Sequence, residues 1–272
     1  MLKTSDVSQK KNSKSDQKEK KSLIGEIIEW IKIIVIALVV ALFINNFIIT
    51  NSYIPTPSME SNLPVGSRLF GFRLNYLFSK PKRGDVVIFD YGFECKNKNT
   101  PLHGSPYMYQ KNAEGKCPRC GTESNGCTKV HYIKRVIGLP GDTVEIKQDE
   151  EHKMVEIERF KTDKTQSILK NMYSTNSAPC GHVYINGEKL EEDYLNEPMI
   201  VMEDERFKGI KKIKVPDDCY FLLGDNRNDS EDARYWKNTF INIKDIEAKA
   251  YLLYWPLNRF GFIRGGEYDK KE

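Results

Sequence analysis

One long apolar stretch near the start of the chain differs from everything that follows it. Residues 23–49 read LIGEIIEWIKIIVIALVVALFINNFII, and residues 33–43 within it are apolar without interruption. A helix needs about 20 mostly apolar residues to cross a bilayer. The stretch reaches that length because Lys32 lies near one end, where its side chain can extend to the interface. The pattern predicts a transmembrane helix over residues 23–49; a buried core helix and a cleaved export signal are the alternatives, although no small-residue cleavage site follows.

Beyond residue 50 the helical period gives way to short apolar and β-branched runs separated by turn residues, which is typical of strands. These runs cover residues 85–91, 131–137, 143–147, 182–185, 219–223 and 248–254. Asn186-Gly187 lies at the centre of residues 183–190 and predicts a two-residue β-hairpin. We therefore expect residues 50–272 to form a mainly β domain of packed or coiled antiparallel sheets with few helices.

Two polar regions interrupt this pattern and predict insertions. The first, at about residues 92–130, holds four of the six cysteines. The second, at about residues 148–214, is charged and irregular on both sides of the hairpin, and predicts a peripheral lobe.

The charge of the chain is concentrated at its ends. Residues 1–22 carry seven lysines among Ser, Gln and Asp, a composition that predicts a disordered tail. Lysines on this side of the apolar stretch place the N-terminus in the cytoplasm and residues 50–272 outside, as a single-pass protein of the cell membrane. The net charge is only +4, and no basic stripe with interleaved aromatic residues is present, which argues against nucleic acid as a partner.

Ser58 is the first candidate for catalytic chemistry. Pro55 and Pro57 flank Thr56 and predict a stiff, extended segment that is neither a helix nor a central strand. Nine residue steps separate Ile49 from Ser58, so the serine stays within about 30 Å of the end of the apolar stretch. An ordinary loop serine is the alternative interpretation.

A serine nucleophile needs a base, and Lys134 is the candidate. The four histidines lie in no triad-like motif, whereas Lys134 lies in a strand pattern on the same face as Tyr132 and Val136. Burial among apolar neighbours would lower its pKa from about 10.4 toward 7–8, which would leave a neutral amine able to accept the serine proton. A strand lysine pointing to water is the alternative.

Four motifs in order then give these residues a context. They are IPTPSM at residues 54–59, KRGDVVIF at 82–89, YIKRVIGLPGD at 132–142 and GDNRNDSEDAR at 224–234. Together with the apolar stretch they resemble the type I signal peptidase family, membrane-anchored serine peptidases with a Ser/Lys dyad. The resemblance implies a coiled antiparallel β-sheet catalytic domain of the signal-peptidase and LexA-like kind, with inserted peripheral lobes.

The resemblance also implies roles for individual residues. Ser58 matches the nucleophile and Lys134 the general base, while the Ser58 N–H and the Thr56 hydroxyl match the oxyanion donors. Ser230 matches a hydroxyl that positions the lysine amine. A supporting ion-pair cluster is matched by Arg135, Asp232 and Arg234. Asp225, Asn226 and Arg227 are interpreted as structural residues of a turn.

Some positions depart from the family pattern. Pro57 stands where glycine is frequent, Ser61-Asn62 replaces a frequent Pro-Thr, and Ala233 stands where serine is common. None of these changes removes a group that the mechanism needs. The family implies exported precursor proteins as substrates, with small residues at the first and third positions before the cut, and membrane lipid as the surroundings.

The cysteines leave three interpretations open, namely a structural zinc site, disulfides and free thiols. Cys117-Pro-Arg-Cys120 resembles a zinc knuckle that Cys95 and Cys127 would complete as a structural site. Disulfides compete outside the cytoplasm, with Cys180 and Cys219 as a further pair. Catalysis itself requires no cofactor.

Two other functions compete with the signal peptidase. One is a self-cleaving LexA-like Ser/Lys peptidase, which is usually soluble and linked to a DNA-binding segment that this chain lacks. The other is a membrane-tethered, Cys-rich module that binds a metal or a partner on an inactive peptidase scaffold. A neutral Lys134 base further predicts that activity rises with pH through its lowered pKa.

Overall fold

A computed structural model describes residues 23–265, except for residue 61 and for residues 96–106, 112–113, 115, 117–126, 149–153, 160–162, 173–176 and 202–211. The tail predicted over residues 1–22 lies outside this part of the chain. The chain divides into two compact units, residues 1–46 and residues 47–272.

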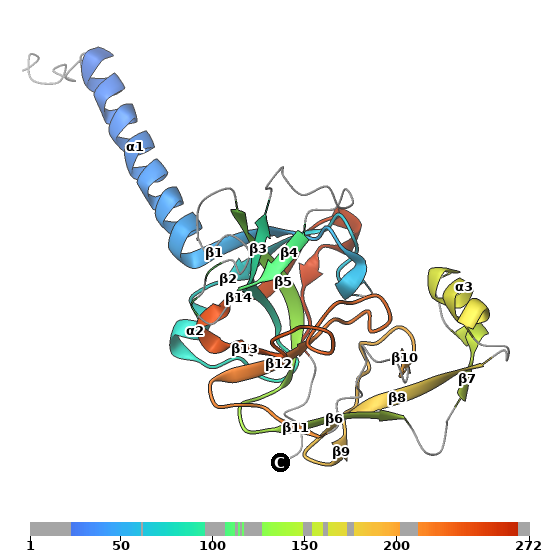
Figure 1. The fold of residues 1–272 in the computed structure, drawn as a ribbon. Helices are drawn as coiled ribbons and strands as arrows, with labels where there is room; N and C mark the ends of the chain where they lie inside the picture. The colour runs from blue at the N-terminus through green and yellow to red at the C-terminus, as the bar shows by residue number, and fades with distance from the viewer. Residues whose placement is uncertain are drawn as a thin grey trace, which may run out of the picture. The chain divides into compact units, whose positions relative to one another are not determined.

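The described part of the first unit is helical. Helix α1, Leu23–Phe43, is followed in the chain by a π-helical turn, Ile44–Ile48 (Figure 1). The segment Gly25–Ile48 is long and apolar enough to cross a membrane, and none of its residues is buried. Exposed apolar side chains suit a helix that lipid surrounds, whereas a core helix would bury them. A helix is therefore present from Leu23 to Ile48 of the predicted range 23–49, whereas Ile49 begins a strand; that this helix spans the membrane stays a prediction.

The second unit begins with a nine-stranded antiparallel sheet, in which seven strands form a continuous path and two pair beside it. In the order of the path these strands are β1 (Ile49–Tyr53), β2 (Arg68–Phe72), β14 (Ile246–Trp255), β3 (Val86–Cys95), β5 (Cys127–Gly138), β12 (Cys219–Leu223) and β13 (Phe240–Asn242). Strand β4 (Tyr107–Gln110) pairs with β3, and β15 (Gly261–Phe262) pairs with β14. The long β3–β5 pair forms the centre and carries Lys134 opposite Val87.

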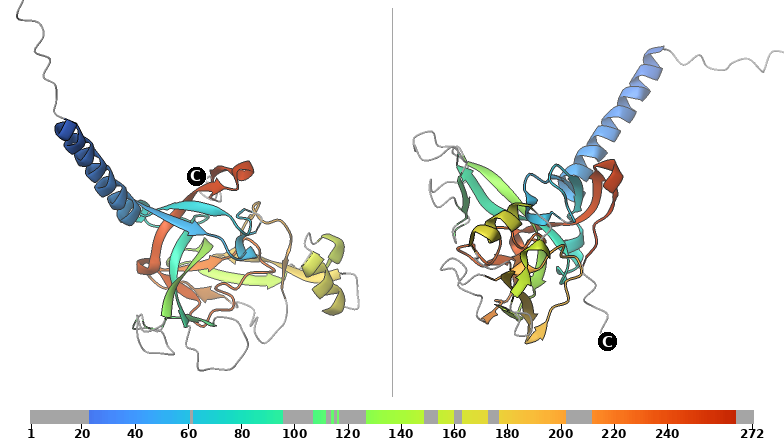
Figure 2. Two further views of the ribbon diagram at one scale, coloured as in Figure 1. Left: turned by 90° about the horizontal axis from the view of Figure 1, so that it is seen from above. Right: turned by 90° about the vertical axis from the view of Figure 1, so that its right-hand side faces the viewer.

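The remaining strands form a six-stranded sheet. It comprises β10 (Met199–Ile200), β8 (Ser177–Ile185), β6 (Thr143–Gln148), β11 (Ile213–Lys214), β7 (Met154–Glu156) and β9 (Glu188–Lys189). Helix α3, Asp163–Met172, lies at the β7–β8 end of this sheet (Figures 1 and 2). Short helical turns occupy Pro57–Met59, Asn75–Phe78 (α2), Ile157–Arg159, Ile243–Asp245 and Leu257–Arg259.

The strand pattern of the sequence is confirmed at all six runs, which lie in β3, β5, β6, β8, β12 and β14. The hairpin is also confirmed. Asn186 and Gly187 adopt φ of 53° and 91° between β8 and β9, as a type I′ turn requires. Strands β1 and β2 were not predicted, because their residues do not alternate cleanly between apolar and polar. Strands β3 and β5 extend into the predicted first insertion, at about residues 92–130, and pair there as far as Cys95 and Cys127.

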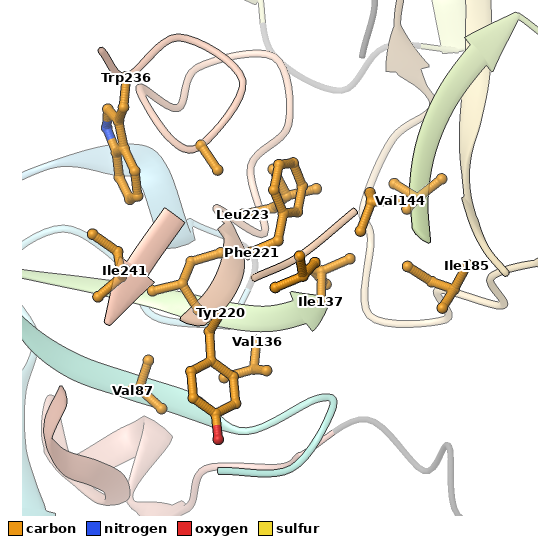
Figure 3. Close-up of a cluster of buried hydrophobic side chains, with 14 of the residues drawn as sticks. Val87, Val136, Ile137, Val144, Ile185, Tyr220, Phe221, Leu223, Trp236 and Ile241 are labelled. Atoms are coloured by element: carbon orange, nitrogen blue, oxygen red, sulfur yellow. The ribbon is translucent and has the colours of Figure 1, made fainter. Parts of the chain in front are cut away.

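One apolar core joins the two sheets. Val87, Val136 and Tyr220 of the larger sheet belong to the same buried cluster as Val144 and Ile185 of the smaller one (Figure 3). A second cluster lies under the nucleophile segment and includes Ile54, Met59, Leu63 and Leu69. Residues on both sides of Ser58 in the sequence are therefore anchored in the core.

Candidate active site

Ser58 lies in a short 3-10 turn between β1 and β2. Pro57 occupies the first position of the turn, where its missing N–H and fixed φ are tolerated. This turn corrects the expectation that Ser58 lies on a wholly extended segment. Met59 is 1% exposed and holds the segment in the core, while the Ser58 side chain is 8% exposed. The N–H of Ser58 lies in the first turn, where backbone donors have no partner inside a helix.

The turn at residues 224–226 binds the nucleophile segment. Asn226 donates twice to it: its backbone N–H to the carbonyl of Ser58 at 3.1 Å and its side-chain amide to the carbonyl of Pro57 at 3.1 Å. The Asp225 N–H lies 3.4 Å from the sulfur of Met59, and the Asn62 amide donates to Asp225 at 2.7 Å. The turn at residues 224–226 thus fixes the backbone on both sides of Ser58, although the two segments are more than 160 residues apart in the sequence.

Lys134 meets Ser58 from the central strand β5. Its Nζ lies 2.6 Å from Ser58 Oγ, and its side chain is 3% exposed. The Nζ also lies 5.3 Å from the centroid of the Tyr132 ring, its neighbour on the same face of the strand. The alternative of a strand lysine that points to water is therefore excluded.

Burial decides the protonation of this lysine. Loss of hydration lowers the pKa of Lys134 to about 8, and this effect outweighs the carboxylates of Asp232, Asp225 and Glu231, which raise it. A substantial fraction of the amine is therefore neutral at mildly alkaline pH. A neutral amine in contact with a serine hydroxyl is the arrangement that general-base activation requires.

Thr56 is placed on the same side of the dyad. Its Oγ1 lies 3.3 Å from Ser58 Oγ, and its side chain is exposed. The threonine hydroxyl and the Ser58 N–H therefore both lie beside the nucleophile, as a pair of oxyanion donors would.

The expected ion-pair cluster is divided into two separate pairs. Arg234 binds Asp232 through two bonds of 2.8 Å, whereas Arg135 binds Asp225 through two bonds of 2.7 Å. The prediction that placed Arg135 with Asp232 and Arg234 is corrected in this respect, because Arg135 and Lys134 alternate across β5 and point to opposite faces. Burial alone would raise the pKa of Asp232, but Arg234 and the N–H of Gly224 hold that pKa below its ordinary value.

Ser230 does not make the predicted bond to the lysine amine. Its Oγ is buried and has no hydrogen-bond partner among the described residues. It nevertheless lies close to the nucleophile backbone, because a Cβ on Gly224 would come within 2.2 Å of Ser230 Oγ and 2.5 Å of the Ser58 carbonyl oxygen. Gly224 is therefore the residue that allows this close approach.

A groove opens directly above the dyad. It has a volume of about 340 Å³ and is lined on one side by residues 53–59 and on the other by residues 130–134 of β5. Asp229 and Glu231 complete the lining. Its walls are mostly apolar, which suits small uncharged side chains next to Ser58.

Sequence reasoning missed several residues that organise this site. Asn226 and Asp225 were assigned to a turn, yet they bind the nucleophile segment and Arg135. Arg227 forms a buried ion pair with Glu192, and the Tyr194 ring lies 4.2 Å from the Arg135 guanidinium carbon. The only available signal was the density of polar residues in GDNRNDSEDAR; nothing near Glu192 or Tyr194 indicated their partners.

The cysteine predictions have mixed outcomes. Cys180 and Cys219 are free thiols, so the disulfide proposed between them is wrong. Burial raises the pKa of Cys180 to about 12, which keeps its thiol protonated. Cys117 and Cys120 lie outside the described residues, as do the side chains of Cys95 and Cys127. Within the described part of the chain, no three His, Cys, Asp or Glu residues are grouped as metal ligands, and the zinc site stays a prediction.

Comparison with known proteins identifies a family for this chain. The family described as signal peptidase, peptidase S26, matches residues 27–255. The chain is 30% identical over 246 residues to signal peptidase I P of Bacillus subtilis subsp. natto, covering 89% of this chain and 95% of the relative. It is 29% identical to signal peptidase I of Leptolyngbya laminosa, covering 86% and 83%. It is also 29% identical to the probable signal peptidase I-2 of Synechocystis sp., covering 85% and 75%.

The fold and the comparisons together define the class as membrane-anchored serine endopeptidases. This chain belongs to the signal peptidase family, peptidase S26.

Proposed function

We propose that this protein cleaves signal peptides from exported precursor proteins at the outer face of the membrane, with Ser58 as nucleophile and Lys134 as general base. The observation that carries the proposal is the 2.6 Å contact between Ser58 Oγ and Lys134 Nζ at a groove large enough for a peptide. The similarity to relatives named signal peptidase I supports the choice of substrate.

The geometry supports an acyl-transfer sequence. The neutral Lys134 amine accepts the Ser58 proton as Oγ attacks the scissile carbonyl, and the new oxyanion lies beside the Ser58 N–H and the Thr56 hydroxyl. The protonated lysine then returns the proton to the leaving amine, which releases the mature protein. Water, activated by the same lysine, hydrolyses the acyl-enzyme and frees the signal peptide. These groups require no cofactor.

The two ion pairs support the dyad electrostatically. Asp225 and Asp232 are paired with Arg135 and Arg234, so that their charges are largely compensated when Lys134 loses its own. An unpaired buried carboxylate would hold Lys134 in its charged form, which cannot act as a base. We infer that Arg135, Asp232 and Arg234 assist in this way, that Thr56 assists as an oxyanion donor, and that Ser230 positions the amine after a small rotation of its hydroxyl.

The dyad is tested by Ser58→Ala and Lys134→Ala in the full-length protein in detergent micelles. Each variant should reduce kcat/KM for a precursor by more than about a thousandfold, because nucleophile and base act as a unit. Matched controls are Ser79→Ala, an exposed serine, and Lys129→Ala, an exposed lysine on the same strand. Retained cleavage by either dyad variant would exclude this mechanism, and an inactive wild-type protein would favour the metal- or partner-binding module on an inactive scaffold.

The proposed topology has its own test. The N-terminus should be cytoplasmic and residues 50–272 outside, as the lysines before α1 predict. In intact cells with a permeable outer surface, added protease should reach the groove-containing unit but spare an epitope at the N-terminus. The opposite protection pattern would reverse the orientation.

A further inference from the structure

Two carboxylates, those of Asp229 and Glu231, line the groove beside Ser58. The acidic and basic residues of its lining are His131, Lys134, Asp229 and Glu231. Lys134 must be neutral to act as the base, and His131 Nδ1 lies 3.3 Å from Glu247, outside the groove lining. When the dyad is ready to react, two carboxylates therefore line the space that the peptide occupies.

Glu231 lies close to the reacting centre. It follows Ser230, which packs against the backbone of Ser58 at Gly224. Its charge is near enough to raise the pKa of Lys134 and to contribute to the raised pKa of Tyr132, whose main cause is burial. The side chain itself is exposed to the groove and to solvent.

Glu231 also differs from the other carboxylates near the dyad. Asp225 and Asp232 are buried in ion pairs with Arg135 and Arg234. Glu231 forms no ion pair or hydrogen bond with any residue in the described part of the chain. The charge of Glu231 is therefore available to a ligand, whereas the charges of Asp225 and Asp232 are not.

The walls of the groove limit which side chains of a peptide can meet this charge. Strand β12 pairs with β5 only at residues 135–138. On the edge of β5 that faces β12, residues 130–134 therefore have no partner among the described strands, and they line the groove. An extended peptide along this wall presents alternate side chains to opposite sides. If small residues at the first and third positions before the cut face the apolar walls, the second position and the position after the cut face outward.

From these observations we propose that Glu231 makes the enzyme select precursors that carry a basic side chain next to the scissile bond. The candidate positions are the second residue before the cut and the first residue after it. A lysine or arginine there gains an attraction to the groove, and an acidic residue is repelled. This specificity rests on the proposed function, because it concerns the same groove and the same reaction.

The test uses peptide substrates that differ at one position only. One set places Lys, Gln or Glu at the second position before the cut, and another set at the first position after it. With the full-length enzyme in neutral detergent micelles at pH 9 and low salt, kcat/KM should be about two- to fivefold higher for Lys than for Gln in at least one set, and lower for Glu. Half-molar salt should reduce this ratio, because an exposed charge pair is screened.

Substitutions of single carboxylates show which residue causes the preference for a basic side chain. Glu231→Gln should bring the Lys to Gln ratio close to one, and Asp229→Asn should reduce it less. Glu188→Gln, which removes an exposed charge on the hairpin strand β9, should keep the wild-type ratio. The inference is overturned if the ratio persists in Glu231→Gln, or if that variant slows all three peptides equally. Equal cleavage of all peptides by the wild type removes the inference alone, whereas cleavage of none removes the proposed function with it.

Discussion

The two sheets of the second unit have interiors of different kinds. Around the larger sheet, the core contains Lys134 and the buried pairs Arg135–Asp225 and Asp232–Arg234. The smaller sheet and helix α3 enclose a plain apolar cluster of Ile157, Leu169, Ala178, Cys180 and Ile200. Of the charged residues that are buried in the described chain, only Asp142 lies at the start of a strand of the smaller sheet.

This difference follows from what each region must do. A lysine base near neutral pH needs a site with little water, and any charge that supports it there must be paired, since an unpaired buried charge costs several kcal/mol. The cluster between the smaller sheet and α3 contains, among the described residues, apolar side chains and the protonated thiol of Cys180, so that apolar packing stabilises it. The two regions nevertheless meet at Glu192–Arg227, which joins the segment before β10 to the turn that holds Ser58.

The largest effect on stability is expected when one of the buried ion pairs around the larger sheet is broken. Asp225→Ala leaves the Arg135 guanidinium buried without its carboxylate, and should lower the free energy of unfolding by about 3–5 kcal/mol. It should also reduce activity, because Asp225 holds Asn62 and the nucleophile segment. Denaturant unfolding in micelles and precursor cleavage measure the two effects. A loss below about 1 kcal/mol would show that this pair is not buried as the structure has it.

The next largest effect on stability is expected when the Glu192–Arg227 ion pair between the two regions is weakened. Glu192→Gln keeps an acceptor for Arg227 but removes its charge, and should cost about 1.5–3 kcal/mol of stability. Arg227 follows directly after Asn226, which binds the backbone of Ser58. The substitution should therefore lower kcat by a larger factor than it changes KM. Glu191→Gln, the exposed neighbour, is the matched control. Unchanged kcat in Glu192→Gln would mean that the two regions act independently.

The pH dependence of kcat/KM tests whether the interior around the larger sheet lowers the pKa of Lys134. The base acts only when it is deprotonated, so kcat/KM should rise about tenfold per pH unit below the Lys134 pKa of about 8 and level off above it. Glu231→Gln removes a negative charge that raises this pKa, and should move the profile to lower pH. A flat profile between pH 5 and 9 would contradict the assignment of Lys134 as base.

The smallest effect on stability is expected from a substitution in the β8–β9 turn of the smaller sheet. Gly187 has φ of 91° in the β8–β9 turn, a conformation that is strained for alanine. Gly187→Ala should therefore cost about 1 kcal/mol or slightly more. No residue of this turn lines the groove, so kcat/KM should stay at the wild-type value. A large loss of activity with this small loss of stability would show that the hairpin acts on the site.

The sequence predicted the parts of this protein that local chemistry governs. The apolar length of α1, the β-branched runs of the central strands and the Asn186-Gly187 turn each have a physical signature within a few residues. The four ordered motifs also made Ser58 and Lys134 candidates for catalysis, because each motif carries several unusual residues at fixed spacing.

Only the tertiary structure decided which of these residues meet. Ser58 and Lys134 are 76 positions apart, and their 2.6 Å contact depends on how β5 packs against the turn after β1. The same packing buries Lys134 and lowers its pKa, and it pairs Arg135 with Asp225 instead of Asp232. Desolvation and long-range pairing depend on the whole fold, since both are set by neighbours that are distant in the sequence; no pattern of nearby residues determines them.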